Sequence, residues 1–95
     1  MKLGNTSLTA WGIEVDGKRH PISRQRLRIL ARLMRARGDC VDHDTLLDVA
    51  WDGRDDGPEA NIVAVQICYL RKNLSAAGSS IQIGNVHGYG YVARA

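Results

Sequence analysis

Polar and cationic side chains that could bind a nucleic acid lie together between positions 61 and 72. Gln66 carries an amide that can pair with both polar atoms on the major-groove edge of adenine, and Asn61 could make the same contact. Arg71 and Lys72 carry positive charges that could contact phosphate groups, which sets register and affinity without reading the base sequence. Side chains of these types could form a surface for a nucleic acid. An ordinary polar helix face is the alternative interpretation.

Apolar and aromatic neighbours could add contacts on the same surface. Ile62 and Val65 could contact the methyl groups of thymine, and Tyr69 could reach a phosphate or a base edge. His87 could enter a narrow minor groove, where it would contribute charge only when protonated, so this contact should weaken as the pH rises. An exposed turn residue is the alternative interpretation of His87. Arg94 adds a further positive charge near the carboxyl end and is included among the expected DNA contacts.

The sequence offers no pattern typical of catalysis or of a metal site. It has no phosphate-binding loop, no ordered Ser-His-Asp set and no pair of carboxylates in an evident cleft, so we predict that it is not an enzyme. Cys40 and His43 have a metal-like spacing, but no second pair of ligands follows them. We therefore expect Cys40 and Cys68 to be free thiols, and we expect no metal and no cofactor.

Length and composition fit one folded domain of 95 residues. The chain is 44% hydrophobic and 24% charged, which is typical of a globular protein and not of a disordered one. Its net charge of +3 suits a nucleic-acid partner without being diagnostic. No apolar run approaches the roughly 18 residues that a membrane span needs, and the amino terminus has no signal-peptide pattern. We therefore expect a cytoplasmic location and no membrane partner.

Apolar spacing predicts three helices in the middle of the chain. Ser23 is a good N-cap for a helix from Arg24 to Arg37, which Gly38 should end. Asp42 can cap a short second helix that ends near Trp51.

The third helix should run from about Glu59 to Ala77 and should end at Gly78. Its apolar residues recur at spacings of four, three and four, which predicts a buried stripe. The stripe consists of Val63, Ile67, Leu70 and Leu74.

Strands are predicted at both ends of the chain. Residues 1–22 should form a small antiparallel sheet, in which Asp16-Gly17 is a strong hairpin turn signal. Residues 80–94 should form a hairpin that turns around His87-Gly88-Tyr89-Gly90. The predicted fold class is therefore α+β, with one domain over residues 1–95: an amino-terminal sheet, three helices over 23–78, and a final hairpin.

The order and spacing of these features resemble the OmpR-type winged-helix DNA-binding domain. A family pattern of Val-x-Val-x-Ile-x-x-Leu-Arg-Lys-x-Leu is met from Val63 to Leu74, and Gly-x-Gly-Tyr is met from Gly88 to Tyr91. Pro21-Ile22-Ser23 is similar to the family's start of the first helix, and Val49-Ala50-Trp51 is similar to the end of its second. Each match alone is weak, but their joint order is specific.

The resemblance implies a transcription regulator of bacterial or phage type. Its third helix would lie in the major groove, and its final hairpin would be the wing, at the minor groove or the backbone. Trp51 matches a family tryptophan whose indole N–H can donate to phosphate, with a core anchor as the alternative. Family members usually carry a receiver domain, and we expect this chain to act without one. Cys68 and Tyr69 stand where the family often has basic residues.

Two charged segments could bind protein partners. The first is an acidic stretch at the place where family members contact RNA polymerase, often its sigma subunit; the candidate residues are Asp52, Arg54, Asp55, Asp56 and Glu59. The second is a row of arginines on the first helix, spaced by four, four and three: Arg24, Arg28, Arg32 and Arg35. The row could be a second basic surface or simply a solvated face. Pairing of the two segments between neighbouring copies would give head-to-tail association on DNA. A homodimer or a tandem on repeated half-sites is also expected, because one small module buries limited surface on DNA.

A second hypothesis is a protein-interaction module, because winged helices are also used in this way. Such a module would bind RNA polymerase, a sigma factor or another regulator. The two hypotheses differ at Gln66, Arg71 and Lys72, which matter for affinity only if DNA is the ligand.

Overall fold

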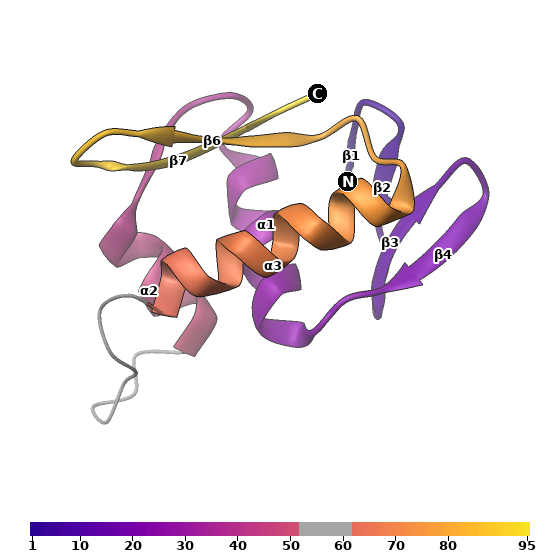
Figure 1. The fold of residues 1–95 in the computed structure, drawn as a ribbon, viewed down its shortest axis with the longest axis horizontal. Coiled ribbons are helices and arrows are strands. Elements are labelled where there is room, and N and C mark those ends of the chain that lie inside the picture. The colour runs from indigo at the N-terminus through magenta and orange to yellow at the C-terminus, as the bar shows by residue number, and fades with distance from the viewer. Residues whose placement is uncertain (52–61) are drawn as a thin grey trace.

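The computed structural model describes residues 1–51 and 62–95. Over these residues the chain forms two small antiparallel sheets and three helices, which confirms the predicted α+β class (Figure 1). The helices are α1 (Arg24–Arg35), α2 (His43–Trp51) and α3 (Ile62–Ala77). In Figure 1, α3 crosses in front of α1. The sheet that contains the carboxyl-terminal strands lies alongside α3, and the amino-terminal sheet lies beyond the carboxyl end of α3.

The amino-terminal sheet has four strands in sequential order, and each strand pairs with the next. Its third and fourth strands are joined by the predicted turn, in which Asp16 and Gly17 have φ values of 51° and 80°. Two successive residues in this left-handed region are typical of a two-residue hairpin turn. The strands are β1 (Lys2–Leu3), β2 (Thr6–Leu8), β3 (Gly12–Val15) and β4 (Lys18–Pro21).

Helix α1 begins where the sequence predicts and ends two residues earlier. The Ser23 hydroxyl accepts a hydrogen bond from the Arg26 backbone N–H at 3.4 Å, so Ser23 is the N-cap. The predicted end at Arg37 is wrong, because Arg37 already has a φ of 52°. A left-handed residue breaks the helical hydrogen-bond pattern, so Arg37 and Gly38 together form the turn that follows the helix.

The second and third helices agree with the prediction over the described residues. Asp42 directly precedes α2 and caps it. Gly78, with a φ of 76°, ends α3. The predicted start of this helix near Glu59 lies outside the described residues. All four residues of the expected stripe are buried, with exposed fractions of 2% or less. They pack with Ile29, Leu30 and Leu33 of α1 and with Leu46 of α2.

The second sheet contains a strand that the sequence analysis did not anticipate. The expected hairpin is present as β6 (Gln82–Val86) and β7 (Gly90–Arg94), but β5 (Val41–Asp42) pairs with the other edge of β7. A β-carbon on Gly90 would lie 1.9 Å from the Val41 carbonyl oxygen, so only glycine permits this approach. The hairpin is therefore attached to the start of α2.

Asn5, in the turn between β1 and β2, joins the amino-terminal sheet to the end of α3. Its Nδ2 donates to the Gly78 carbonyl at 3.0 Å, and its Oδ1 accepts from the Ser80 backbone N–H at 2.7 Å. Its own backbone N–H donates to the Ser80 hydroxyl at 3.1 Å. These bonds fix the carboxyl end of α3, from which the chain turns into β6.

Candidate nucleic-acid interface

The outward face of α3 lies opposite its buried stripe. Val65 and Tyr69 are 37% and 45% exposed, and Cys68 and Lys72 are exposed as well. Because a helix turns by about 100° per residue, these four positions fall on one side of α3. The Lys72 ammonium lies 5.7 Å from the centre of the Tyr69 ring. The outward face of α3 is therefore a mainly apolar strip with one ammonium group.

Arg26 of α1 reaches one side of this strip, which we call the α1 flank and define by Arg26, Gln66, Tyr69 and Asn73. The Arg26 Nε donates to Gln66 Oε1 at 2.9 Å, and its Nη1 donates to Asn73 Oδ1 at 3.4 Å. The centre of its guanidinium lies 4.8 Å from the centre of the Tyr69 ring, within the range of a cation–π interaction. One guanidinium thus contacts three side chains on successive turns of α3.

Arg71 holds the opposite side of α3, which we call the wing flank and define by Arg71, Ile83 and Asn85. Its Nε and Nη2 donate to the Ile83 carbonyl oxygen at 3.0 and 2.8 Å, and Nη2 also donates to Asn85 Oδ1. Ile83 and Asn85 belong to β6. The bond to a backbone carbonyl fixes the hairpin against α3.

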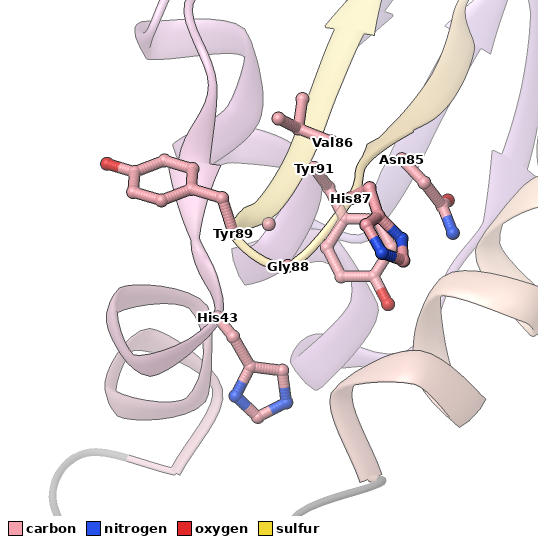
Figure 2. Close-up of a pocket in the computed structure, with 8 residues that line it drawn as sticks. His43, Asn85, Val86, His87, Gly88, Tyr89 and Tyr91 are labelled. Atoms are coloured by element: carbon pink, nitrogen blue, oxygen red, sulfur yellow. The ribbon is translucent and has the colours of Figure 1, made fainter.

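A pocket of about 350 Å³ lies under the hairpin turn (Figure 2). His43, at the start of α2, lies on its far side from the turn, and Asn85, His87 and Tyr91 extend from the hairpin toward α3, while Tyr89 points the other way. The His43 backbone N–H donates to the Tyr89 carbonyl at 3.1 Å, so the turn is tied to the start of α2. Asn85 of this pocket also accepts from Arg71, so the pocket adjoins the wing flank of α3.

Asp42 stabilises the start of α2 beside this pocket. Its carboxylate accepts hydrogen bonds from the Thr45 hydroxyl at 2.6 Å and from the Thr45 backbone N–H at 3.1 Å. These two bonds favour the charged carboxylate and hold the pKa of Asp42 below its usual value. Asp42 also pairs with Gly90 of β7, so the same residue caps α2 and belongs to the sheet formed by β5, β7 and β6.

The arginine row on α1 is only partly open to solvent. Arg24 and Arg35 are exposed, while Arg28 and Arg32 are half-buried. Arg32 and Arg35 lie in the last turn of α1, where positive charge interacts favourably with the helix dipole. Helix stabilisation therefore accounts for part of the row without any partner.

The remaining predicted residues differ in exposure and in their distance from the outward face of α3. Ile62 is half-buried and packs against the core, which leaves only part of its side chain for a base. Arg94 is exposed at the base of the hairpin, paired with Gln82, and so lies at the opposite end of β7 from His87. Three of the predicted parts lie outside what the structure describes: the side chain of Trp51, the residue Asn61 and the acidic stretch. That stretch includes Asp52, Arg54, Asp55, Asp56 and Glu59.

Three residues of the two flanks escaped the sequence analysis: Arg26, Asn73 and Asn85. Arg26 lies outside the arginine row, and its partner Gln66 is 40 positions away, so no local pattern connects them. Asn73 falls within the matched Leu-Arg-Lys-x-Leu pattern at its variable position, and Asn85 lies in a strand. Their polar character is the one signal in the sequence that could have suggested them.

Within residues 1–51 and 62–95, no group of three or more His, Cys, Asp or Glu side chains is placed to hold a metal ion. Cys40 and Cys68 are free thiols, as predicted. None of the described helices combines the length and the apolar character that crossing a membrane requires.

The described helices and sheets define a class of protein. An exposed third helix that lies beside a β-hairpin, with the preceding helix packed against it, is the arrangement of a winged helix-turn-helix domain. The family model of the carboxyl-terminal domain of transcriptional regulatory proteins matches residues 17–93, and the chain belongs to this family. The family comprises regulatory domains and is not an enzyme class.

Known relatives are response regulators. The cell cycle response regulator CtrA of Brucella anthropi is 36% identical over 89 residues, and the response regulator ArlR of Staphylococcus haemolyticus is 32% identical over 85 residues. These matches cover 93% and 90% of this chain, but the chain spans only 38% of the length of either relative.

A solved structure is similar over nearly the whole chain. The carboxyl-terminal domain of the nisin resistance regulator NsrR, a lantibiotic response regulator, superposes with a TM-score of 0.80 at 26% identity. The match covers 99% of this chain and 96% of that one. The winged-helix fold is therefore shared along the chain.

Proposed function

We propose that this domain binds duplex DNA with sequence preference and regulates transcription. Helix α3 enters the major groove, and the β6–β7 hairpin contacts the minor groove or the backbone. The observation that carries the proposal is the exposed face of α3 beside a fixed hairpin, in a chain of the transcriptional regulatory family. Helices α1 and α2 support this face and brace the backbone contacts.

Phosphate contacts come mainly from Lys72 and, in part, from Arg71. Lys72 is exposed on the outward face, and its ammonium stays close to the Tyr69 ring. Arg71 is exposed, and a guanidinium has five N–H donors, so donors remain beside those that bind Ile83 and Asn85. Arg71 therefore has a double role, in which one edge holds the wing and the other meets a phosphate.

Base contacts come from the strip between the two flanks. Val65 is exposed enough to meet a thymine methyl group, and Gln66 supplies an amide at the α1 flank. His87 extends from the wing turn toward DNA, and Arg94 contacts the backbone farther along the hairpin. Asn61 and Trp51 add contacts at the start of α3 and the end of α2, outside the side chains that the structure describes.

Binding to repeated half-sites, as a dimer or a tandem, follows from size. A single module of this kind buries limited surface on DNA, so two copies on adjacent sites would raise affinity and specificity. The acidic stretch from Asp52 to Glu59 is the proposed contact with RNA polymerase or its sigma subunit. Reversing the charge of Asp55 and Asp56 should then lower activation in a reconstituted transcription assay while DNA binding persists.

Fluorescence anisotropy with labelled random and genomic duplexes, over a series of salt concentrations, tests the DNA proposal. We expect log affinity to fall linearly with log salt, and some duplexes to bind more tightly than others. Lys72→Ala should reduce the steepness of this line by about one unit, because one phosphate contact is lost. Absence of binding at low salt would exclude the proposal and favour a protein partner, which a pull-down with RNA polymerase would then test.

Lys18→Ala is the matched control for Lys72→Ala. Lys18 is an exposed lysine at the start of β4, in the amino-terminal sheet, so its loss changes the net charge by the same amount. We expect the salt dependence of this variant to equal that of the wild type. Equal losses in both variants would mean that DNA responds to net charge and not to the face of α3.

A further inference from the structure

Arg26 determines which way the Gln66 amide faces. A guanidinium has only N–H donors, so its partner atom on Gln66 must be the carbonyl oxygen Oε1. This bond at 2.9 Å turns Oε1 toward α1 and Nε2 away from it. A glutamine that pairs with adenine uses both amide atoms, with Oε1 accepting from N6 and Nε2 donating to N7.

The other contacts of Arg26 keep its guanidinium in this position. Nη1 donates to Asn73 Oδ1 at 3.4 Å, and the Tyr69 ring lies 4.8 Å away. Arg26, Gln66 and Asn73 are all half-buried, which limits the competition from water. Because Arg26 belongs to the rigid first turn of α1, the orientation of Gln66 is set before any DNA arrives.

We infer that Arg26 is a positioning residue that selects the base read by α3, by holding Gln66 with its donor outward and its acceptor engaged. A base edge with two acceptors, guanine O6 and N7, then matches this amide better than adenine, whose N6 is a donor. This inference rests on the proposed function, because it concerns the DNA contact of the same helix. The rival role for Arg26 is simple positive charge near the backbone, which would weaken all duplexes alike.

The inference is tested by measuring affinities for two kinds of duplex. One is a duplex selected for binding to the wild type, the other is the same duplex with guanine and adenine exchanged, and the ratio of the two affinities is compared between variants. We expect Arg26→Ala to reduce the guanine-over-adenine ratio by about tenfold at the position that Gln66 reads, as Gln66→Ala should. The double variant should lose no more than either single variant, because both remove one coupled contact. A decrease in affinity by the same factor for every duplex would overturn the inference.

Arg26→Lys and Arg24→Ala separate positioning from charge. Lysine keeps the charge but lacks the planar guanidinium that binds Gln66 and Asn73 together, so we expect Arg26→Lys to lose the ratio as well. Arg24 is exposed one position after Ser23, and Arg24→Ala removes the same charge, so its effect should be equal for all duplexes. Retention of the full ratio by Arg26→Lys would contradict the positioning role.

A measurement without DNA keeps this inference distinct from the proposed function. Nuclear magnetic resonance of the isotope-labelled protein should show the Gln66 side-chain N–H₂ pair shifted in Arg26→Ala and Arg26→Lys but not in Arg24→Ala. Thermal unfolding of each variant confirms that it is folded. Unchanged Gln66 signals would refute the contact itself, whereas absence of duplex binding by the wild type would remove the proposed function and the base preference with it.

Discussion

The two flanks of α3 are both held by arginine, but their partners differ in kind. On the wing flank, Arg71 donates two hydrogen bonds to a backbone carbonyl, that of Ile83, and only one contact, with Asn85, goes to a side chain. On the α1 flank, Arg26 donates to two side-chain amides, those of Gln66 and Asn73, and lies against the Tyr69 ring. One arginine therefore fixes the path of the chain, and the other fixes the orientation of side chains.

This difference separates architecture from recognition on one helix. A backbone carbonyl is present whatever residue occupies position 83, so the two bonds to Ile83 survive changes in the wing sequence, and only the bond to Asn85 depends on a side chain. The contacts of Arg26 depend on the identity of residues 66, 69 and 73, so they can change with the DNA sequence to be read. Disruption of the wing flank should therefore affect stability and all DNA binding, and disruption of the α1 flank should mainly affect preference.

The largest effect is expected from Gly90→Ala, which separates β5 from the hairpin that carries the wing flank. The new β-carbon would lie 1.9 Å from the Val41 carbonyl oxygen and 2.8 Å from the Asp42 Cα, so β5 and β7 must separate. We expect the free energy of unfolding to fall by about 3 kcal/mol, measured by urea denaturation. Duplex binding should weaken for every sequence, without a change in preference.

Gly84→Ala, in β6 of the same hairpin, is the matched control for Gly90→Ala. A β-carbon there would meet the Val92 side chain at 3.5 Å, which is an ordinary contact. We expect its stability to stay close to that of the wild type. Similar losses in both variants would show that the hairpin rejects any side chain at either glycine, and that the β5–β7 approach is not the cause.

Arg71→Lys should give a smaller effect and should separate the two roles of Arg71. Lysine keeps the charge that a phosphate needs but cannot direct two N–H groups at the Ile83 carbonyl. We expect a loss of about 1 kcal/mol in stability, reduced by the exposure of Arg71, and faster hydrogen exchange at the backbone amides of β6. Arg94→Lys, on the neighbouring strand, should change neither. Unaltered exchange in Arg71→Lys would leave phosphate binding as its only role.

The sequence was sufficient for most of the architecture because that architecture follows from local signals. The stripe from Val63 to Leu74 has helical spacing, and Ser23 and Asp42 are caps that act within three residues. The turn at Asp16 needs only the preference of Asp and Gly for left-handed backbone. Each of these features depends on neighbours in the chain, so a pattern can reveal it.

The rest of the site depends on distant pairs that no local pattern encodes. Strand β5 has two residues, too few to alternate, and exists because β7 approaches it. Arg26 meets Gln66 across 40 positions, and Arg71 meets Ile83 only after the chain has turned at Gly78. The sequence predicted which polar side chains α3 carries. It could not predict that Arg26 and Arg71 already donate hydrogen bonds on the two flanks of this helix.

The smallest effect is expected from Asp42→Asn, which tests the attachment of the hairpin to the start of α2 through β5. The pKa of Asp42 is lowered in the folded protein, chiefly by the Thr45 hydroxyl and then by the Thr45 backbone N–H. Its contribution to stability is therefore complete above the ordinary aspartate pKa of about 3.9 and is lost as the pH falls through this value toward the lowered one. Asparagine also caps helices well, so Asp42→Asn should stay nearly as stable at neutral pH but lose less stability on acidification.

Urea denaturation at about pH 6 and at a series of lower pH values, down through the ordinary aspartate pKa of about 3.9, measures this difference, because the contribution of a carboxylate with a lowered pKa is lost as the pH falls there. Thr45→Val is the companion variant, since it removes the hydroxyl donor and keeps the backbone N–H. It should raise the pKa of Asp42 toward its usual value and give a pH dependence between those of the wild type and Asp42→Asn. Because Asp42 also pairs with Gly90, the protection of β7 amides relative to their intrinsic exchange rate at each pH should decrease at low pH in the wild type and decrease less in Asp42→Asn. Equal acid sensitivity in all three proteins would mean that the cap of α2 and the sheet formed by β5, β7 and β6 are not coupled. The hairpin would then be held by Arg71 and the β5–β7 pairing alone.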